Sequence, residues 1–141
     1  MNHEKEDRNL TAEPELVSRE ELEKIVGGDD TSLPAPSADI LARAVAELGK
    51  AYSWGGVGPD SYDTSGFVSY CVTGLHARLG TTFDFMSWPQ AATPEPGDIC
   101  TNSSYCGIYA GPNSMIYVSE SYGSVRYGNI AGDMVIVRYV G

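Results

Sequence analysis

Histidine and basic side chains are scarce in this chain of 141 residues. It has two histidines, His3 and His76, and nine lysines and arginines against 19 aspartates and glutamates, a formal net charge of -10. So few imidazoles leave little for metal binding or acid–base catalysis, and we expect neither a metal site nor a cofactor. The acidic excess argues against nucleic acid or an anionic membrane surface as the main partner, because both attract basic surfaces.

The cysteines are few and odd in number. Cys71, Cys100 and Cys106 cannot all pair, which excludes a disulfide-based scaffold. One alternative stays open: Cys100 and Cys106 oppose each other across a hairpin and form a disulfide if the protein is exported. No apolar run approaches the roughly 20 residues that a membrane helix needs. The N-terminus also lacks the apolar core of a secretory signal peptide.

The acidic residues are concentrated at the start of the chain, which we interpret as an arm (residues 1–36) ahead of one domain (residues 37–141). Residues 1–38 contain ten acidic and four basic side chains. Residues 17–26 predict a short helix that Ser18 caps, with Glu21 completing a Ser-x-x-Glu capping box. A proline-containing linker follows at residues 29–36. The simplest interpretation is an acidic helix that frays on a flexible linker.

Gly27 and Gly28 end this helix and support a second interpretation. Apolar residues and one acidic residue precede them at regular distances: Val17, Glu21, Leu22 and Ile25. The segment resembles the double-glycine leader of peptides that peptidase-containing ABC transporters export. The resemblance implies that such an exporter is a partner and that cleavage after Gly28 releases a secreted protein starting at Asp29. Without cleavage and export, we expect a cytoplasmic protein.

The domain is predicted to consist of helices followed by strands. Apolar residues at helical spacing predict a helix over residues 37–48. Asp63 or Thr64 caps a second helix that runs to about Leu79. After residue 98 the apolar period drops to two, which predicts five strands: Ile99–Thr101, Cys106–Ala110, Met115–Glu120, Ser124–Tyr127 and Met134–Tyr139. This order is typical of an α+β domain whose sheet packs on the helices.

Four short motifs follow one another between residues 38 and 139. They are Tyr52-Ser53-Trp54-Gly55-Gly56, the stretch from Gly58 to Gly66, Pro96-Gly97-Asp98 and Gly107-Ile108-Tyr109-Ala110-Gly111. Together they resemble the NlpC/p60 family of cell-wall cysteine peptidases. The resemblance implies a papain-like fold in which helices pack against an antiparallel sheet. Family members typically cleave γ-D-glutamyl bonds in the stem peptides of peptidoglycan.

The same resemblance implies that the catalytic residues of the family are replaced in this chain. The family places a cysteine at the start of a helix, a histidine on a facing strand and a third polar residue on the next strand. These positions correspond here to Thr64, Tyr105 and Tyr117. A tyrosine with a pKa near 10 is a poor base at neutral pH. His76 lies 12 residues along the predicted helix, about 18 Å from Thr64, and is too distant to help.

The cysteines do not replace the lost nucleophile in this interpretation. Cys71 lies about 10 Å deeper along the predicted helix than Thr64 and is expected to be a small core residue. Cys106 is expected to face away from the cleft, because neighbouring strand residues alternate between faces. The sequence thus predicts no group near the helix start that is able to attack a peptide bond or to carry a proton.

The residues that match ligand-binding positions of the family remain. Tyr52 and Asp63 match positions where the family binds the free amine of the stem peptide, Ser65 matches a neighbouring contact, and Trp54 lies in the same motif. Alternatively, Asp63 is only a helix cap, and the two aromatic residues belong to the core. We expect a catalytically inactive domain that binds a peptide or protein partner, with a peptidoglycan stem peptide as one candidate. The alternative function is a weak γ-D-glutamyl hydrolase that uses Thr64 or Ser65.

Overall fold

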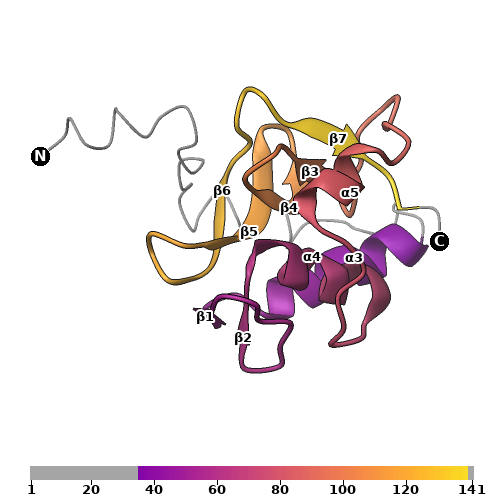
Figure 1. Ribbon diagram of the computed structural model, residues 1–141. Helices are drawn as coiled ribbons and strands as arrows, with labels where there is room; N and C mark the ends of the chain where they lie inside the picture. Colours follow the sequence, from indigo (N-terminus) through magenta and orange to yellow (C-terminus); the bar gives the residue numbers. More distant parts are fainter. Residues whose placement is uncertain (1–34, 140–141) are drawn as a thin grey trace, which may run out of the picture.

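The computed structural model describes residues 35–139. The elements are α3 (Ala35–Ala46), β1 (Ala51–Tyr52), β2 (Ser61–Tyr62), α4 (Thr64–Thr73), α5 (Thr82–Met86), β3 (Ile99–Thr101), β4 (Cys106–Gly111), β5 (Ser114–Ser119), β6 (Ser124–Asn129) and β7 (Val135–Val137). Helices α3 and α4 lie on one face of a seven-stranded sheet (Figure 1). Residues 1–34 of the predicted arm, including Gly27 and Gly28, lie outside the described residues. Ala35 and Pro36, predicted as the end of the linker, form the start of α3 instead. The predicted α+β class is confirmed.

The strands are arranged in the order β2-β1-β6-β5-β4-β3-β7. Only β1 and β2 pair in parallel, and all other pairs are antiparallel. The five predicted strands are confirmed: β3 has the predicted ends, and the ends of the other four differ by at most two residues. The two-residue strands β1 and β2 were not predicted, because two residues are too few to show an alternating pattern.

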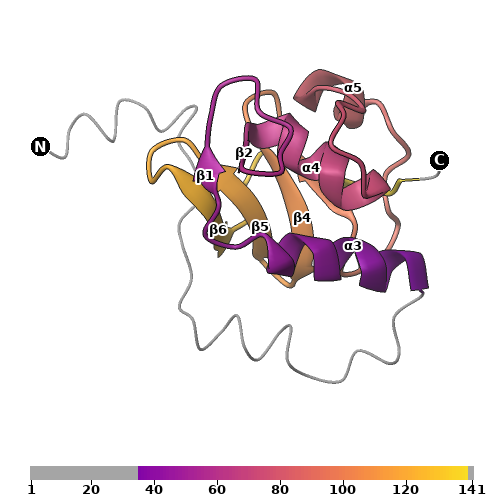
Figure 2. The ribbon, with the colours of Figure 1, turned by 90° about the horizontal axis from the view of Figure 1, so that it is seen from below.

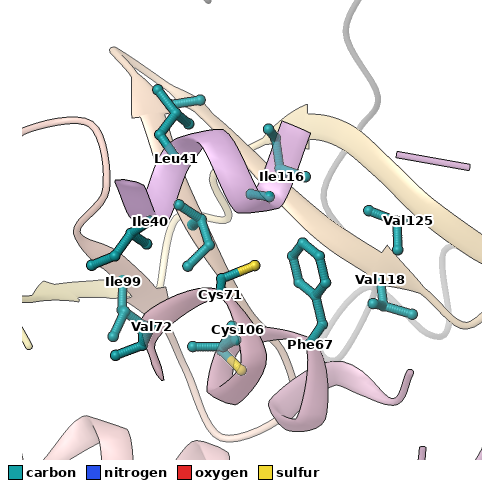
Figure 3. Close-up of a cluster of buried hydrophobic side chains, with 14 of the residues drawn as sticks. Ile40, Leu41, Phe67, Cys71, Val72, Ile99, Cys106, Ile116, Val118 and Val125 are labelled. Atoms are coloured by element: carbon teal, nitrogen blue, oxygen red, sulfur yellow. The ribbon is translucent and has the colours of Figure 1, made fainter. Parts of the chain in front are cut away.

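The main core fills the space between the helices and the sheet (Figures 2 and 3). Alternation along β5 sends Ile116 and Val118 toward the helices and Met115 and Tyr117 to the opposite face, where those two pack with Cys100 in a second cluster. The helices supply the other half of the main core: Ile40, Leu41 and Ala44 from α3, and Phe67, Val68, Cys71 and Val72 from α4. Each large apolar side chain buried in this way stabilises the fold by about 1.5–3 kcal/mol. Cys71 is fully buried in this core, which confirms the prediction that it is a small core residue.

Helix α4 is shorter than predicted, and the expected end at Leu79 is wrong. The helix stops at Thr73, and Gly74 takes the left-handed conformation (φ 77°) while its N–H donates to the Tyr70 carbonyl oxygen at 2.6 Å. Leu75 and Leu79 continue the apolar spacing in sequence, but their side chains are 63% and 39% exposed. The apolar spacing therefore extends past a glycine that had already ended the helix.

His76 lies beyond the end of α4 rather than on it. Its ring stacks on Tyr70, with centroids 4.5 Å apart, and its Nδ1 is 3.0 Å from the carbonyl oxygen of Val57. The imidazole therefore packs against the glycine-rich loop.

The disulfide between Cys100 and Cys106 is not formed, and all three cysteines are free and buried. In the β3–β4 ladder Cys100 pairs with Gly107, and Cys106 pairs with Thr101. The two thiols consequently lie on opposite faces of the sheet, Cys106 in the main core and Cys100 in the second cluster.

Candidate functional site

The start of α4 is fixed by its cap and by a close backbone contact. Asp63 is the N-cap, and its Oδ1 accepts the Gly66 N–H at 2.7 Å. The Asp63 N–H donates to the carbonyl oxygen of Gly56 at 2.8 Å. A Cβ on Gly66 would lie 2.0 Å from that oxygen, so only glycine lets the glycine-rich loop reach the first turn of the helix. The loop is therefore anchored directly at the helix start.

A pocket of about 270 Å³ opens at this helix start. Its lining residues are Tyr52, Trp54, Asp63, Thr64, Ser104, Tyr105, Val118 and Glu120. Five of these were predicted site residues, so the structure brings together Tyr52, Trp54, Asp63, Thr64 and Tyr105. Ser104, Val118 and Glu120 also line the pocket, and no sequence motif had indicated them. Trp54 is 90% exposed and lies at the pocket mouth, so the alternative that it is a core residue is wrong.

The hydroxyl group of Thr64 is held by the backbone of Cys106. Thr64 Oγ1 accepts the Cys106 N–H at 3.0 Å and donates to the Cys106 carbonyl oxygen at 3.3 Å. The hydroxyl thus uses its proton and a lone pair within the protein. This pair of bonds fastens the first turn of α4 to the first residue of β4.

The thiol of Cys106 also lies against Thr64, and the expectation of no sulfhydryl near the helix start is wrong. Its Sγ donates to the Thr64 carbonyl oxygen at 3.4 Å and lies 3.8 Å from Thr64 Oγ1. Cys106 does face away from the neighbouring Tyr105, as alternation requires. The prediction failed because it did not place the first turn of α4 on the same face of β4 as the Cys106 side chain.

The environment of Cys106 suppresses its reactivity. The side chain is fully buried and does not line the pocket. Burial raises the pKa of the thiol from 9.0 to about 12, although the hydrogen bond with Thr64 acts in the other direction. Because the thiolate is the nucleophilic form of cysteine, this thiol is inert at neutral pH.

The guanidinium group of Arg78 binds Asp63 and Ser65, the two residues that were predicted to bind an amine of the ligand. Its Nη1 and Nη2 donate to Asp63 Oδ1 and Oδ2 at 3.0 and 2.9 Å, and Nη1 also donates to Ser65 Oγ at 2.7 Å. Ser65 is buried on the Arg78 side and does not line the pocket. Sequence reasoning missed Arg78, because it placed this residue within a longer α4. The reversal at Gly74 is what returns Arg78 to the helix start.

Tyr105 and Tyr117, which the family resemblance assigns to the base and orienting positions, differ in exposure. Tyr105 lines the pocket, whereas Tyr117 is fully buried behind it, with ring centroids 6.3 Å apart and planes at 90°. Tyr117 therefore supports Tyr105. Tyr52 also lines the pocket, and burial and then the charges of Glu120 and Asp63 raise its pKa, so this phenol stays protonated.

Within residues 35–139, no three histidine, cysteine or carboxylate side chains gather as metal ligands. None of the helices in that range has the length and apolar character needed to cross a bilayer.

Comparison with known proteins identifies similar sequences. The sequence model of the NlpC/P60 family matches residues 49–141. A probable endopeptidase p60 from Listeria seeligeri is 38% identical over 106 residues, which cover 66% of this chain and 19% of that protein. A probable endopeptidase from Mycobacterium tuberculosis H37Rv is 30% identical over 104 residues, 69% of this chain and 25% of that protein. The chain thus spans about a fifth to a quarter of the length of these curated relatives.

Solved structures share the fold at low sequence identity. RipB, a peptidoglycan hydrolase of Mycobacterium tuberculosis, has a TM-score of 0.61 and 20% identity, and the match covers 89% of this chain and 69% of RipB. RipD of the same organism is described as a non-catalytic NlpC/p60 domain protein adapted to a peptidoglycan-binding function. It has a TM-score of 0.62 and 18% identity, with 77% of this chain and all of RipD covered. These neighbours confirm the predicted papain-like fold.

Proposed function

The chain belongs to the NlpC/P60 family, and we propose that its domain binds a peptide in the pocket at the start of α4 without cleaving it. The candidate ligand is a peptidoglycan stem peptide, the substrate class that the family resemblance implies. The domain is related to p60 endopeptidases. Binding without cleavage is the further step that the proposal takes.

The engagement of the Thr64 hydroxyl carries this proposal. A hydroxyl nucleophile needs a neighbouring base to take its proton during attack. The Thr64 proton is instead directed at the carbonyl oxygen of Cys106, which is no base, and its oxygen already accepts an N–H. Attack on a peptide by the Thr64 hydroxyl would require both hydrogen bonds with the Cys106 backbone to break.

The rest of the pocket offers no substitute for the missing imidazole. Among the described residues that line it, none is a histidine or a cysteine. The family resemblance assigns Tyr105 to the position of the catalytic histidine, and a phenol does not replace an imidazole as the base that accepts the nucleophile's proton. Asp63 is held by Arg78 in a two-pronged ion pair. The pocket thus favours holding a peptide over activating a nucleophile.

The features needed for recognition are present in the same place. Tyr52, Trp54 and Tyr105 supply aromatic surface, and Ser104 and Glu120 add polar groups in a cavity of about 270 Å³. Rigid tyrosine and tryptophan side chains give contact area at low entropic cost. RipD, with its similar fold, provides a precedent for an NlpC/p60 domain described as binding without catalysis.

A stem-peptide titration tests the proposal. The full chain is mixed with the tripeptide L-alanyl-γ-D-glutamyl-L-lysine, and calorimetry and mass spectrometry then report binding and cleavage. We expect saturable binding and intact peptide. Cleavage that disappears in Thr64→Ala or Ser65→Ala would support the alternative of a weak hydrolase and contradict the proposal.

We also propose that residues 1–28 are an export leader and that the domain is secreted after cleavage at Gly27-Gly28. This rests on the resemblance of that segment to double-glycine leaders, and it assigns an ABC exporter as a partner. The test is to express the chain with and without such an exporter and to determine the first residue of the protein in the medium by mass spectrometry.

A further inference from the structure

Glu120 is the pocket carboxylate that no described residue neutralises. It is exposed just after the end of β5, lines the pocket, and forms no hydrogen bond or ion pair with residues 35–139. The other carboxylate of the pocket, Asp63, is paired with Arg78 and also accepts the Gly66 N–H. A cationic group entering the pocket must compete with Arg78 for Asp63 but meets no such competitor at Glu120.

The turn between β5 and β6 fixes the position of Glu120 beside Tyr52. The Gly123 N–H donates to the Ser119 carbonyl oxygen and the Tyr122 N–H to Ser119 Oγ, both at 2.8 Å. The Tyr52 N–H in turn donates to the carbonyl oxygen of Gly123 at 2.9 Å, which ties the turn to β1. The Glu120 backbone is therefore part of a closed, hydrogen-bonded turn.

The surroundings of Glu120 suit a cation. Tyr52 and Tyr105 line the pocket, and Trp54 lies exposed at its mouth. The faces of aromatic rings attract ammonium groups through their quadrupole. No lysine or arginine among the described residues lines the pocket, and the chain has a net charge of -10, which favours the approach of cations.

We propose that Glu120 binds a primary ammonium group of the peptide ligand, with Tyr52 and Trp54 packed around it. The inference rests on the proposed function, since it assigns one contact in the same pocket. It also moves the amine-binding role away from Asp63 and Ser65, which the sequence predicts but which Arg78 occupies. A peptide has such a group either at its N-terminus or on the side chain of a diamino acid, and the experiment distinguishes the two.

The test uses calorimetry on the full chain with L-alanyl-γ-D-glutamyl-L-lysine, which carries both amines. The Nα-acetyl, Nε-acetyl and diacetyl forms of this tripeptide are titrated in parallel. Glu120→Gln removes the charge while keeping the size of the side chain. Asp39→Asn is the matched control, because Asp39 is an exposed carboxylate of α3 that does not line the pocket.

We expect Glu120→Gln to weaken binding of the free tripeptide about ten-fold or more, because a charge-assisted hydrogen bond is lost. Asp39→Asn should leave the affinity unchanged. Acetylation of the amine that binds Glu120 should weaken binding to wild type, and Glu120→Gln should then cause no further loss of affinity. The singly acetylated peptide that behaves in this way identifies the amine that binds Glu120. Circular dichroism should show that both variants are folded.

Two results would overturn the assignment while leaving the proposed function in place: equal affinity of wild type and Glu120→Gln, or equal losses in Glu120→Gln and Asp39→Asn. In both cases the peptide still binds wild type. If wild type binds none of the four peptides, the proposed function itself is wrong, and the role of Glu120 falls with it.

Discussion

Thr64 and Cys106 lie 42 residues apart in sequence, and the hydroxyl of Thr64 bonds both the N–H and the carbonyl oxygen of Cys106. The helix start is thus fastened to β4 at the position where the family resemblance implies a catalytic cysteine. The Thr64 side chain therefore forms a structural link between α4 and β4. The stability and the reactivity of this link are both measurable.

Thr64→Val is expected to lower the free energy of unfolding by about 1–3 kcal/mol, because the Cys106 N–H loses its acceptor inside the protein. Valine keeps the branched shape of threonine, so the loss reports the hydroxyl. Urea denaturation measures it, with Thr64→Ser as the control that keeps the hydroxyl. If Thr64→Val is as stable as Thr64→Ser, the hydrogen bonds do not link α4 to β4 as described.

Arg78→Gln is expected to destabilise the domain only modestly, by up to about 1 kcal/mol, because the ion pair with Asp63 is partly exposed. Arg78→Lys should not restore the loss, since an ammonium cannot bind both carboxylate oxygens and Ser65 as the planar guanidinium does. Urea denaturation at low and high salt provides the measurement. A lysine variant equal to wild type would contradict the two-pronged geometry.

Cys106 predicts a loss of stability at alkaline pH. Below pH 9 the thiol is protonated in both states and adds no pH dependence. Between pH 9 and about 12 the unfolded chain releases this proton while the folded chain keeps it, because burial raises the pKa of the thiol to about 12. The free energy of unfolding should therefore fall by up to about 1.4 kcal/mol per pH unit from this group.

The matching variant is Cys106→Ala, in which this contribution to the slope disappears. Urea denaturation at pH 8, 9, 10 and 11 compares the two slopes, and a constant difference in stability between the proteins does not affect that comparison. Identical slopes would mean that the Cys106 thiol ionises in the folded protein as readily as in the unfolded chain.

The proposed leader predicts a defined new N-terminus. Expressed together with a peptidase-containing ABC exporter, the protein should appear in the medium with Asp29 as its first residue. Gly28→Val should stop this cleavage, because the glycine pair enters a narrow cleavage site. Intact-mass spectrometry of the medium and of the cells makes the measurement. Secreted protein that still begins at Met1 would contradict the leader.

The local signals in the sequence predicted most of the elements that surround the site. The sequence predicts Asp63 or Thr64 as the cap, and the structure selects Asp63, whose carboxylate accepts a free N–H of the first turn. The strands from β3 to β7 followed from their alternating pattern. The end of α4 was misplaced because Leu75 and Leu79 keep a helical spacing, whereas Gly74 decides the backbone conformation. Apolar spacing reports burial only while the helix continues.

The contacts that define the site depend on packing between distant segments. Arg78 reaches Asp63 only after the chain reverses at Gly74, and Cys106 reaches Thr64 only because β4 lies under the first turn of α4. Glu120 is the last residue of a predicted strand, lies just after the observed end of β5, and belongs to no motif. The sequence motifs indicated Asp63, Thr64 and Ser65 as site residues, but they carried no signal for Arg78 and Cys106, which contact these residues in the structure.

The fate of the bound tripeptide tests the central claim most directly. L-alanyl-γ-D-glutamyl-L-lysine is incubated with the full chain at a concentration where calorimetry shows the pocket to be filled, and the mixture is followed by mass spectrometry. We predict that the peptide remains intact for as long as it does without protein. Release of the alanyl-glutamyl fragment by wild type, and its absence with Thr64→Ala, would contradict a domain that binds without cleaving.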